Sequence, residues 1–98
     1  MADQKTFHIV LERGAEKDFG RLPTGAKQTV LQEVQRWLVT SPFREIKTRI
    51  KRLSGFVPPL YRLRIGDYRA YYRILSDRVV ILAILHKKDS DRWLRRFR

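Results

Sequence analysis

Residues 51–74 read KRLSGFVPPLYRLRIGDYRAYYRI, and this stretch decides the fold. Over residues 61–65 apolar and basic residues alternate, so a β-strand here would have one apolar and one basic face. Gly66-Asp67 is typical of a tight turn, and the alternation resumes over residues 68–74. The stretch therefore predicts a β-hairpin whose arginines share a surface that attracts phosphate. These arginines are Arg62, Arg64, Arg69 and Arg73.

The length of 98 residues predicts a single domain, 1–98, with one modest hydrophobic core. Because the chain has no cysteine, disulfides and thiolate metal sites are excluded. Its longest apolar run, residues 79–85, is the size of a strand and too short to cross a membrane. We expect a cytoplasmic protein with no membrane association, no metal site and no cofactor.

Positive charge is concentrated in the second half of the chain. Residues 1–43 contain 6 basic and 5 acidic side chains, whereas residues 44–98 contain 16 and 5. A well-solvated basic surface is one interpretation. Because the excess lies on predicted strands and their flanks, we favour a nucleic acid or a large acidic protein as the partner.

The remaining elements follow from periodicity and breaking residues. The pattern predicts a strand over residues 6–11, a short helix over 12–22, and a longer helix from Thr24 that Ser41-Pro42 stops. Residues 43–59 have no sustained period and predict a basic loop. An apolar strand follows over residues 79–85, and a basic amphipathic helix over residues 90–98.

This element order predicts an α+β fold. The N-terminal strand, a two-helix hairpin and a three-stranded antiparallel meander would form one sheet, with a short C-terminal helix at the end. The helices would pack on one face of an antiparallel sheet, and the face with the arginines would be left for a partner.

The chain resembles the RelE/ParE superfamily of bacterial toxins from toxin–antitoxin operons, over nearly its whole length. The resemblance is strongest in Leu53-Ser54-Gly55, in the run from Tyr61 to Arg69, and in Tyr72 and Ile74. It implies a RelE-like microbial ribonuclease fold. It also leaves two activities open, since RelE-like members cut mRNA in the ribosomal decoding site and ParE-like members inhibit DNA gyrase without cutting RNA.

We favour the RelE-like activity, an endoribonuclease (mRNA interferase) that acts on the ribosome without a metal. Such an enzyme uses the 2′-hydroxyl of the RNA as the nucleophile, and arginines suit the developing phosphate charge. The resemblance maps basic active-site residues onto Arg62, Arg64 and Arg69. RelE-like members have lysines where Arg62 and Arg64 stand, and an arginine seldom releases a proton.

His86 offers a proton-transferring group just after the strand over residues 79–85. We expect it to act as general acid or base with Lys87 as a supporting cation, and to meet Arg64 and Arg69 around one phosphate. The alternative is that His86 only ends the strand and bonds to a carbonyl. Trp93 either stacks on a base or anchors the last helix, and we favour the anchor. The remaining candidates for RNA binding are Lys47, Arg49, Lys51, Arg52, Arg73 and Lys88.

The resemblance also implies partners. A toxin of this kind is held by a cognate antitoxin in a hetero-oligomer, through an acidic or amphipathic segment that covers the basic face or displaces the last helix. The ribosome and mRNA would be its targets.

Overall fold

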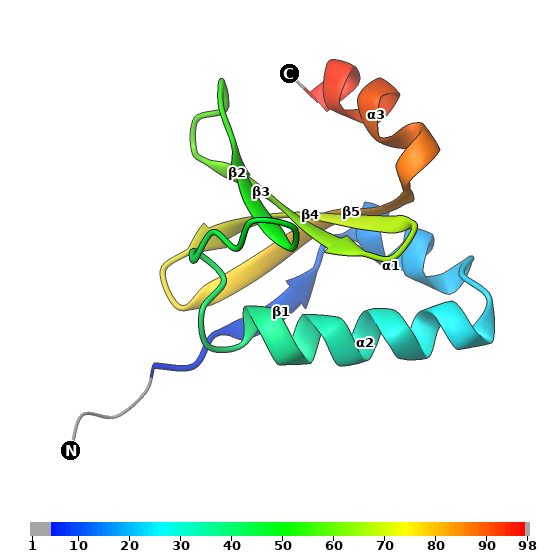
Figure 1. The fold of residues 1–98 in the computed structure, drawn as a ribbon, viewed down its shortest axis with the longest axis horizontal. Coiled ribbons are helices and arrows are strands. Elements are labelled where there is room, and N and C mark those ends of the chain that lie inside the picture. The colour runs from blue at the N-terminus through cyan, green and yellow to red at the C-terminus, as the bar shows by residue number, and fades with distance from the viewer. Residues whose placement is uncertain (1–4, 98) are drawn as a thin grey trace.

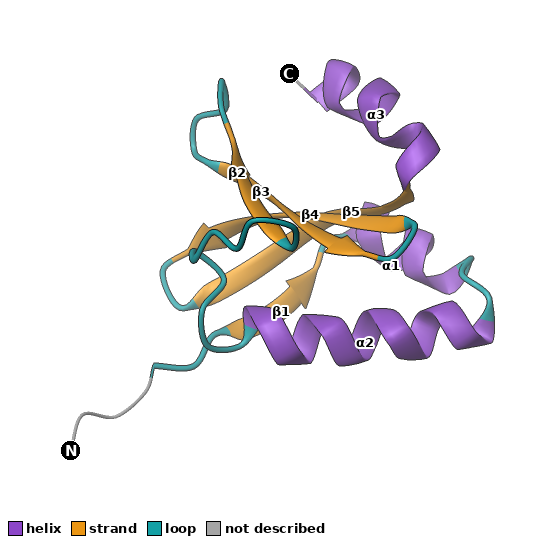
Figure 2. Ribbon diagram, viewed as in Figure 1, coloured by secondary structure: helices purple, strands orange, loops and turns teal. Residues whose placement is uncertain are grey.

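The computed structural model describes residues 5–97, and a five-stranded sheet forms its centre (Figures 1 and 2). The strands lie in the order β1-β5-β4-β3-β2. Arg98, which the sequence analysis includes in the last helix, lies outside the described residues. The strands are β1 (His8–Leu11), β2 (Ile50–Leu53), β3 (Leu60–Ile65), β4 (Tyr68–Leu75) and β5 (Arg78–His86). The helices are α1 (Arg13–Gly20), α2 (Thr24–Leu38), the 3-10 turn η1 (Lys87–Asp89) and α3 (Ser90–Phe97).

The hairpin predicted from residues 61–74 is present as β3 and β4, with Ile65 paired to Tyr68 across the turn. Gly66 has a φ of 56°, a left-handed conformation that glycine adopts without steric cost. Leu63 and Ala70 pair across the hairpin and are both fully buried. The alternation therefore assigns the two faces of the hairpin correctly.

The α+β fold class is confirmed, but two details of the sheet were wrong. Four residues of the predicted loop over 43–59 form β2, which pairs with β3 at the edge of the sheet. A strand of that length is too short to produce a recognisable alternation. The sheet is also mixed, because β1 pairs parallel to β5 while the other strands are antiparallel.

Helices α1 and α2 cover one face of the sheet, below it in Figure 1. Ala15 of α1 and the apolar residues Val30, Val34 and Leu38 of α2 are buried against it, as the helical stripe predicts. Two polar contacts fix this layer. The hydroxyl of Tyr72 donates to the carbonyl of Pro42 at 2.6 Å, and the backbone N–H of Ile84 donates to the carboxylate of Asp18 at 3.0 Å.

Helix α3 lies over the opposite face, so that face is not wholly left for a partner as expected (Figure 1). Its Trp93 stacks on Tyr71 of β4 with ring centroids 4.9 Å apart, and on Phe97 at 4.7 Å. Tyr71 is only 1% exposed as a result. Among the described helices, none is long and apolar enough to span a membrane.

Candidate functional site

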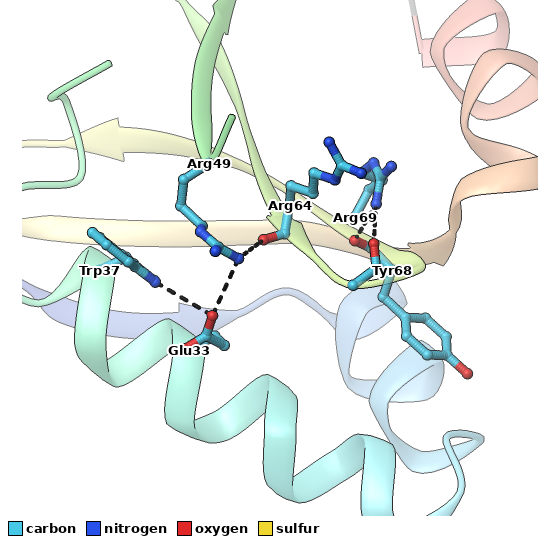
Figure 3. Close-up of polar contacts among 7 residues, drawn as sticks. Glu33, Trp37, Arg49, Arg64, Tyr68 and Arg69 are labelled. Carbon is cyan, nitrogen blue, oxygen red and sulfur yellow. Dashed lines mark hydrogen bonds and ion pairs between the residues drawn. The ribbon is translucent and has the colours of Figure 1, made fainter. Parts of the chain in front are cut away.

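Three arginines share the sheet face that α3 leaves open, and we call Arg62, Arg64 and Arg69 the arginine face. Arg64 pairs with Arg69 across the β3–β4 hairpin, and Arg62 lies two pairs further along, opposite Tyr71. Paired residues of antiparallel strands have neighbouring side chains on the same face. Figure 3 shows the guanidinium groups of Arg64 and Arg69 close together on one side of the hairpin. The structure thus brings together the three arginines that the sequence predicted.

Arg69 is held firmly at the hairpin turn. One of its terminal nitrogens donates to the carbonyl of Gly66 at 2.7 Å and to that of Tyr68 at 2.9 Å (Figure 3). Partial burial lowers the pKa of Arg69, and the nearby charges of Arg64 and Arg62 lower it further. These cations repel one another, so an anion bound between them would stabilise all three.

The basic surface continues from the arginine face onto the edge of the sheet. Lys51 pairs with Arg62 across β2 and β3. A small cavity of about 100 Å³ is lined by Lys47, Thr48, Arg49, Lys51, Arg62 and Arg64. A second groove, of about 440 Å³, lies between the β2 region and α3, with Lys51 and Arg52 among its lining residues. Lys47, Lys51 and Arg52 therefore lie where an extended anion could follow the surface.

Lys87 lies at the end of the arginine face where the hairpin turns. Its backbone N–H donates to the carbonyl of Asp67 at 2.7 Å, and its ammonium group lies 3.4 Å from the Asp67 carboxylate. The Asp67 carboxylate acts against burial and the neighbouring arginines, because it raises the pKa of Arg69. The sequence gives no sign that Asp67 belongs to the site, because a tight turn fully explains an aspartate after a glycine.

The structure does not bring His86 to the arginines, so the expected meeting around one phosphate was wrong. His86 pairs with Tyr68, and their rings make an edge contact at 5.6 Å. Tyr68 points to the side of the hairpin away from Arg64 and Arg69 (Figure 3). His86 ends β5, as the alternative interpretation expects, but its Nδ1 accepts the backbone N–H of Lys88 at 3.2 Å and caps η1, where a bond to a carbonyl was expected.

Two more RNA-binding candidates take part in the contact between α3 and the sheet. The guanidinium of Arg73 lies 5.0 Å from the ring centroid of Phe97, and its Nε is buried without a hydrogen-bond partner. Trp93 has Tyr71 and Phe97 stacked against it, so its indole anchors the helix, as we favoured. Lys88 is exposed in η1, just before α3. Arg73 and Trp93 are half-buried, so Lys88 is the most exposed of these three residues.

Known proteins match both the sequence and the fold. The family model described as ParE toxin of type II toxin-antitoxin system, parDE, matches residues 9–90. The RelE1 protein of Methanocaldococcus jannaschii is 31% identical over 85 residues, which are 86% of this chain and 92% of that protein.

Two solved toxin–antitoxin complexes contain similar chains. A chain of the RelBE2 complex of Mycobacterium tuberculosis has a TM-score of 0.72 at 25% identity, with 88% of this chain and 97% of that chain covered. A chain of the archaeal RelE–RelB complex of Pyrococcus horikoshii has a TM-score of 0.69 at 25% identity, with 84% and 96% covered.

Proposed function

Because the chain belongs to the RelE/ParE superfamily of toxins from type II toxin–antitoxin systems, we propose that it is a ribosome-dependent mRNA endonuclease that arrests translation. The observation that supports this activity is that the β3–β4 pairing puts Arg62, Arg64 and Arg69 on one face of the sheet, in the part that α3 leaves open. The proposal places the protein in the cytoplasm, with the ribosome and mRNA as its targets.

The proposed cleavage is metal-independent. The 2′-hydroxyl of the RNA releases its proton to water as its oxygen attacks the adjacent phosphorus, the bond to the 5′-oxygen breaks, and a 2′,3′-cyclic phosphate and a 5′-hydroxyl result. Arg64 and Arg69 bind the phosphoryl oxygens as negative charge develops, with Arg62 as a further cation. Since His86 lies on the other side of the hairpin, we assign protonation of the leaving 5′-oxygen to the Lys87 ammonium beside the turn.

Primer extension on mRNA from cells that express the protein tests this activity. We expect cuts at defined codon positions with the wild-type protein, and their loss with Arg64→Ala and with Arg69→Ala. Arg78→Ala is a matched control, because it removes one exposed positive charge at the start of β5. Intact mRNA in cells arrested by the wild-type protein would refute the nuclease proposal.

Gyrase inhibition is the second candidate, and the position of His86 favours it. A toxin that only binds requires the charge of the arginine face and no acid or base beside it, and the matching family model is named for ParE. Under this alternative, cells would show gyrase-linked DNA damage while their mRNA stays intact. The same expression experiment therefore separates the two activities.

We further propose that a cognate antitoxin covers the basic surface in a toxin–antitoxin hetero-oligomer. By their names, one of the two similar solved structures is a RelE–RelB complex and the other is the toxin–antitoxin complex RelBE2. An acidic or amphipathic segment would contact the same cations as the RNA. Antitoxin and RNA should then exclude each other, and a stable ternary complex with undiminished RNA binding would contradict this.

A further inference from the structure

We propose that Arg49, held by Glu33 of α2, is a positioning residue that fixes Arg64 on the arginine face. This inference rests on the proposed function, because it assigns Arg49 a role in presenting Arg64 to the phosphate. It also replaces the expectation that Arg49 itself binds RNA. The residues concerned are shown in Figure 3.

Arg49 contacts both backbone polar groups of Arg64, the N–H and the carbonyl. The backbone N–H of Arg64 donates to the carbonyl of Arg49 at 2.8 Å. In the other direction, a terminal guanidinium nitrogen of Arg49 donates to the carbonyl of Arg64 at 3.1 Å. Since β2 begins at Ile50, which pairs with Leu63, these two bonds continue the contact between the two chain segments by one residue, to Arg64 near the end of β3.

Glu33 fixes the guanidinium that makes this contact. The same nitrogen of Arg49 lies 3.3 Å from a carboxylate oxygen of Glu33, which also accepts the indole N–H of Trp37 at 3.4 Å. The Arg49 guanidinium lies 5.5 Å from the Trp37 ring centroid. The side chains of Arg49 and Glu33 are only 33% and 19% exposed. Arg49 is thus committed to α2 and to Arg64, and points away from the Arg64 guanidinium (Figure 3).

This network explains an acidic residue that otherwise opposes the proposed function. Glu33 places a negative charge near a surface that should attract RNA, and charge alone predicts that its removal strengthens RNA binding. If Glu33 holds Arg49 in place, its removal should instead weaken catalysis, because a small displacement of a catalytic group is costly. The two expectations have opposite signs.

Glu33→Met provides the decisive variant, with Glu16→Met as its control. Both remove one carboxylate, but Glu16 is exposed on α1. In the ribosome-dependent cleavage assay we expect Glu33→Met to lower kcat by roughly 10²-fold with little change in KM, as for a displaced catalytic group. Glu16→Met should behave as the wild type. Glu33→Gln keeps an oxygen acceptor and should retain most of the activity. If Glu33→Met does not fold, the Arg49→Met variant carries the test.

Arg49→Met, with Arg44→Met as its exposed control, distinguishes positioning from RNA contact. Removing a residue that contacts phosphate should reduce, by about one, the slope of the logarithm of the RNA-binding constant against the logarithm of the salt concentration. We expect Arg49→Met to leave that slope unchanged and to lower kcat as Glu33→Met does. A reduced slope, or a Glu33→Met protein as active as the wild type, would overturn the inference.

Hydrogen exchange at the Arg64 amide provides a readout that does not depend on nuclease activity. The amide should exchange faster in Glu33→Met and Arg49→Met than in their controls, because its acceptor is the Arg49 carbonyl. If the wild-type protein does not cut RNA, the proposed function fails while this exchange difference still stands. If the protein cuts RNA and the exchange is unchanged, the positioning inference fails alone.

Discussion

Replacing His86 with asparagine or alanine separates a capping role from proton transfer. In the structure, His86 Nδ1 accepts the N–H of Lys88 at 3.2 Å and starts the turn that carries Lys87 to Asp67. Asparagine can accept the same bond and alanine cannot, and neither can act as general acid or base at this position. The two variants should therefore differ if His86 is a cap, and should be equally inactive if it transfers a proton.

The expected magnitudes also differ. Loss of a cap costs about 1 kcal/mol, which for a domain of this size lowers Tm by about 4–8 °C. We expect this loss for His86→Ala, with a several-fold fall in cleavage as Lys87 becomes less well placed. His86→Asn should stay close to the wild type in both measurements. Loss of a general acid or base would cost about 10²- to 10⁴-fold in rate.

Thermal unfolding and single-turnover cleavage on programmed ribosomes, measured on the same preparations, check this prediction. The pH dependence of the cleavage rate should keep its shape in His86→Asn. A cleavage rate at least about 10²-fold lower in both variants, with Tm unchanged in His86→Asn, would refute the capping role and show that His86 transfers a proton.

Three further outcomes are expected. Tyr72→Phe should lower stability by about 1–3 kcal/mol, because the buried Pro42 carbonyl loses its donor. Burial, and to a lesser degree Tyr61, raises the pKa of Tyr72 above its ordinary value of 10.0, so the stability of the wild-type protein should fall above that pH. Denaturant titrations should show a smaller fall for Tyr72→Phe. Asp18→Ala should cost about 1–3 kcal/mol by leaving the Ile84 N–H unpaired, and Asp18→Asn clearly less. A short RNA at about 100 times its Kd should stabilise the protein by about 2.7 kcal/mol in a melting experiment at low salt, and the effect should shrink as salt is added.

The hairpin and the arginine face could be predicted because both depend on local alternation. A period of two over residues 61–74 assigns each side chain to a face, and burial of Leu63 and Ala70 then follows. The edge strand β2 gave no such signal, since only Ile50 of its four residues is fully buried. The parallel pairing of β1 with β5 joins the two ends of the chain, and periodicity carries no information on partners so distant.

The position of His86 could not be predicted for a related reason. Its position just after the apolar strand over residues 79–85 suggested a proton-transferring role, but the face of a strand residue depends on its pairing, and His86 pairs with Tyr68. The contact between Arg49 and Glu33 could not be predicted from the sequence either. Glu33 lies on the polar side of a helix pattern, where solvent is the ordinary expectation, and only the packing of α2 beside β3 brings it to the arginine.

On our proposal, the arrangement of charge explains why one surface can bind both the substrate and the inhibitor. Burial and the charges of Arg64 and Arg62 all lower the pKa of Arg69, which means that the free protein holds its cations in an unfavourable arrangement. Any polyanion that binds there removes repulsion as well as gaining attraction, whether it is RNA or an acidic protein segment. On our inference, the contacts of Arg49 with Glu33 and with the Arg64 carbonyl hold the Arg64 backbone in place when no polyanion is bound. On our proposal, rigid presentation of mutually repelling arginines is therefore what makes RNA and antitoxin competitors for a single site.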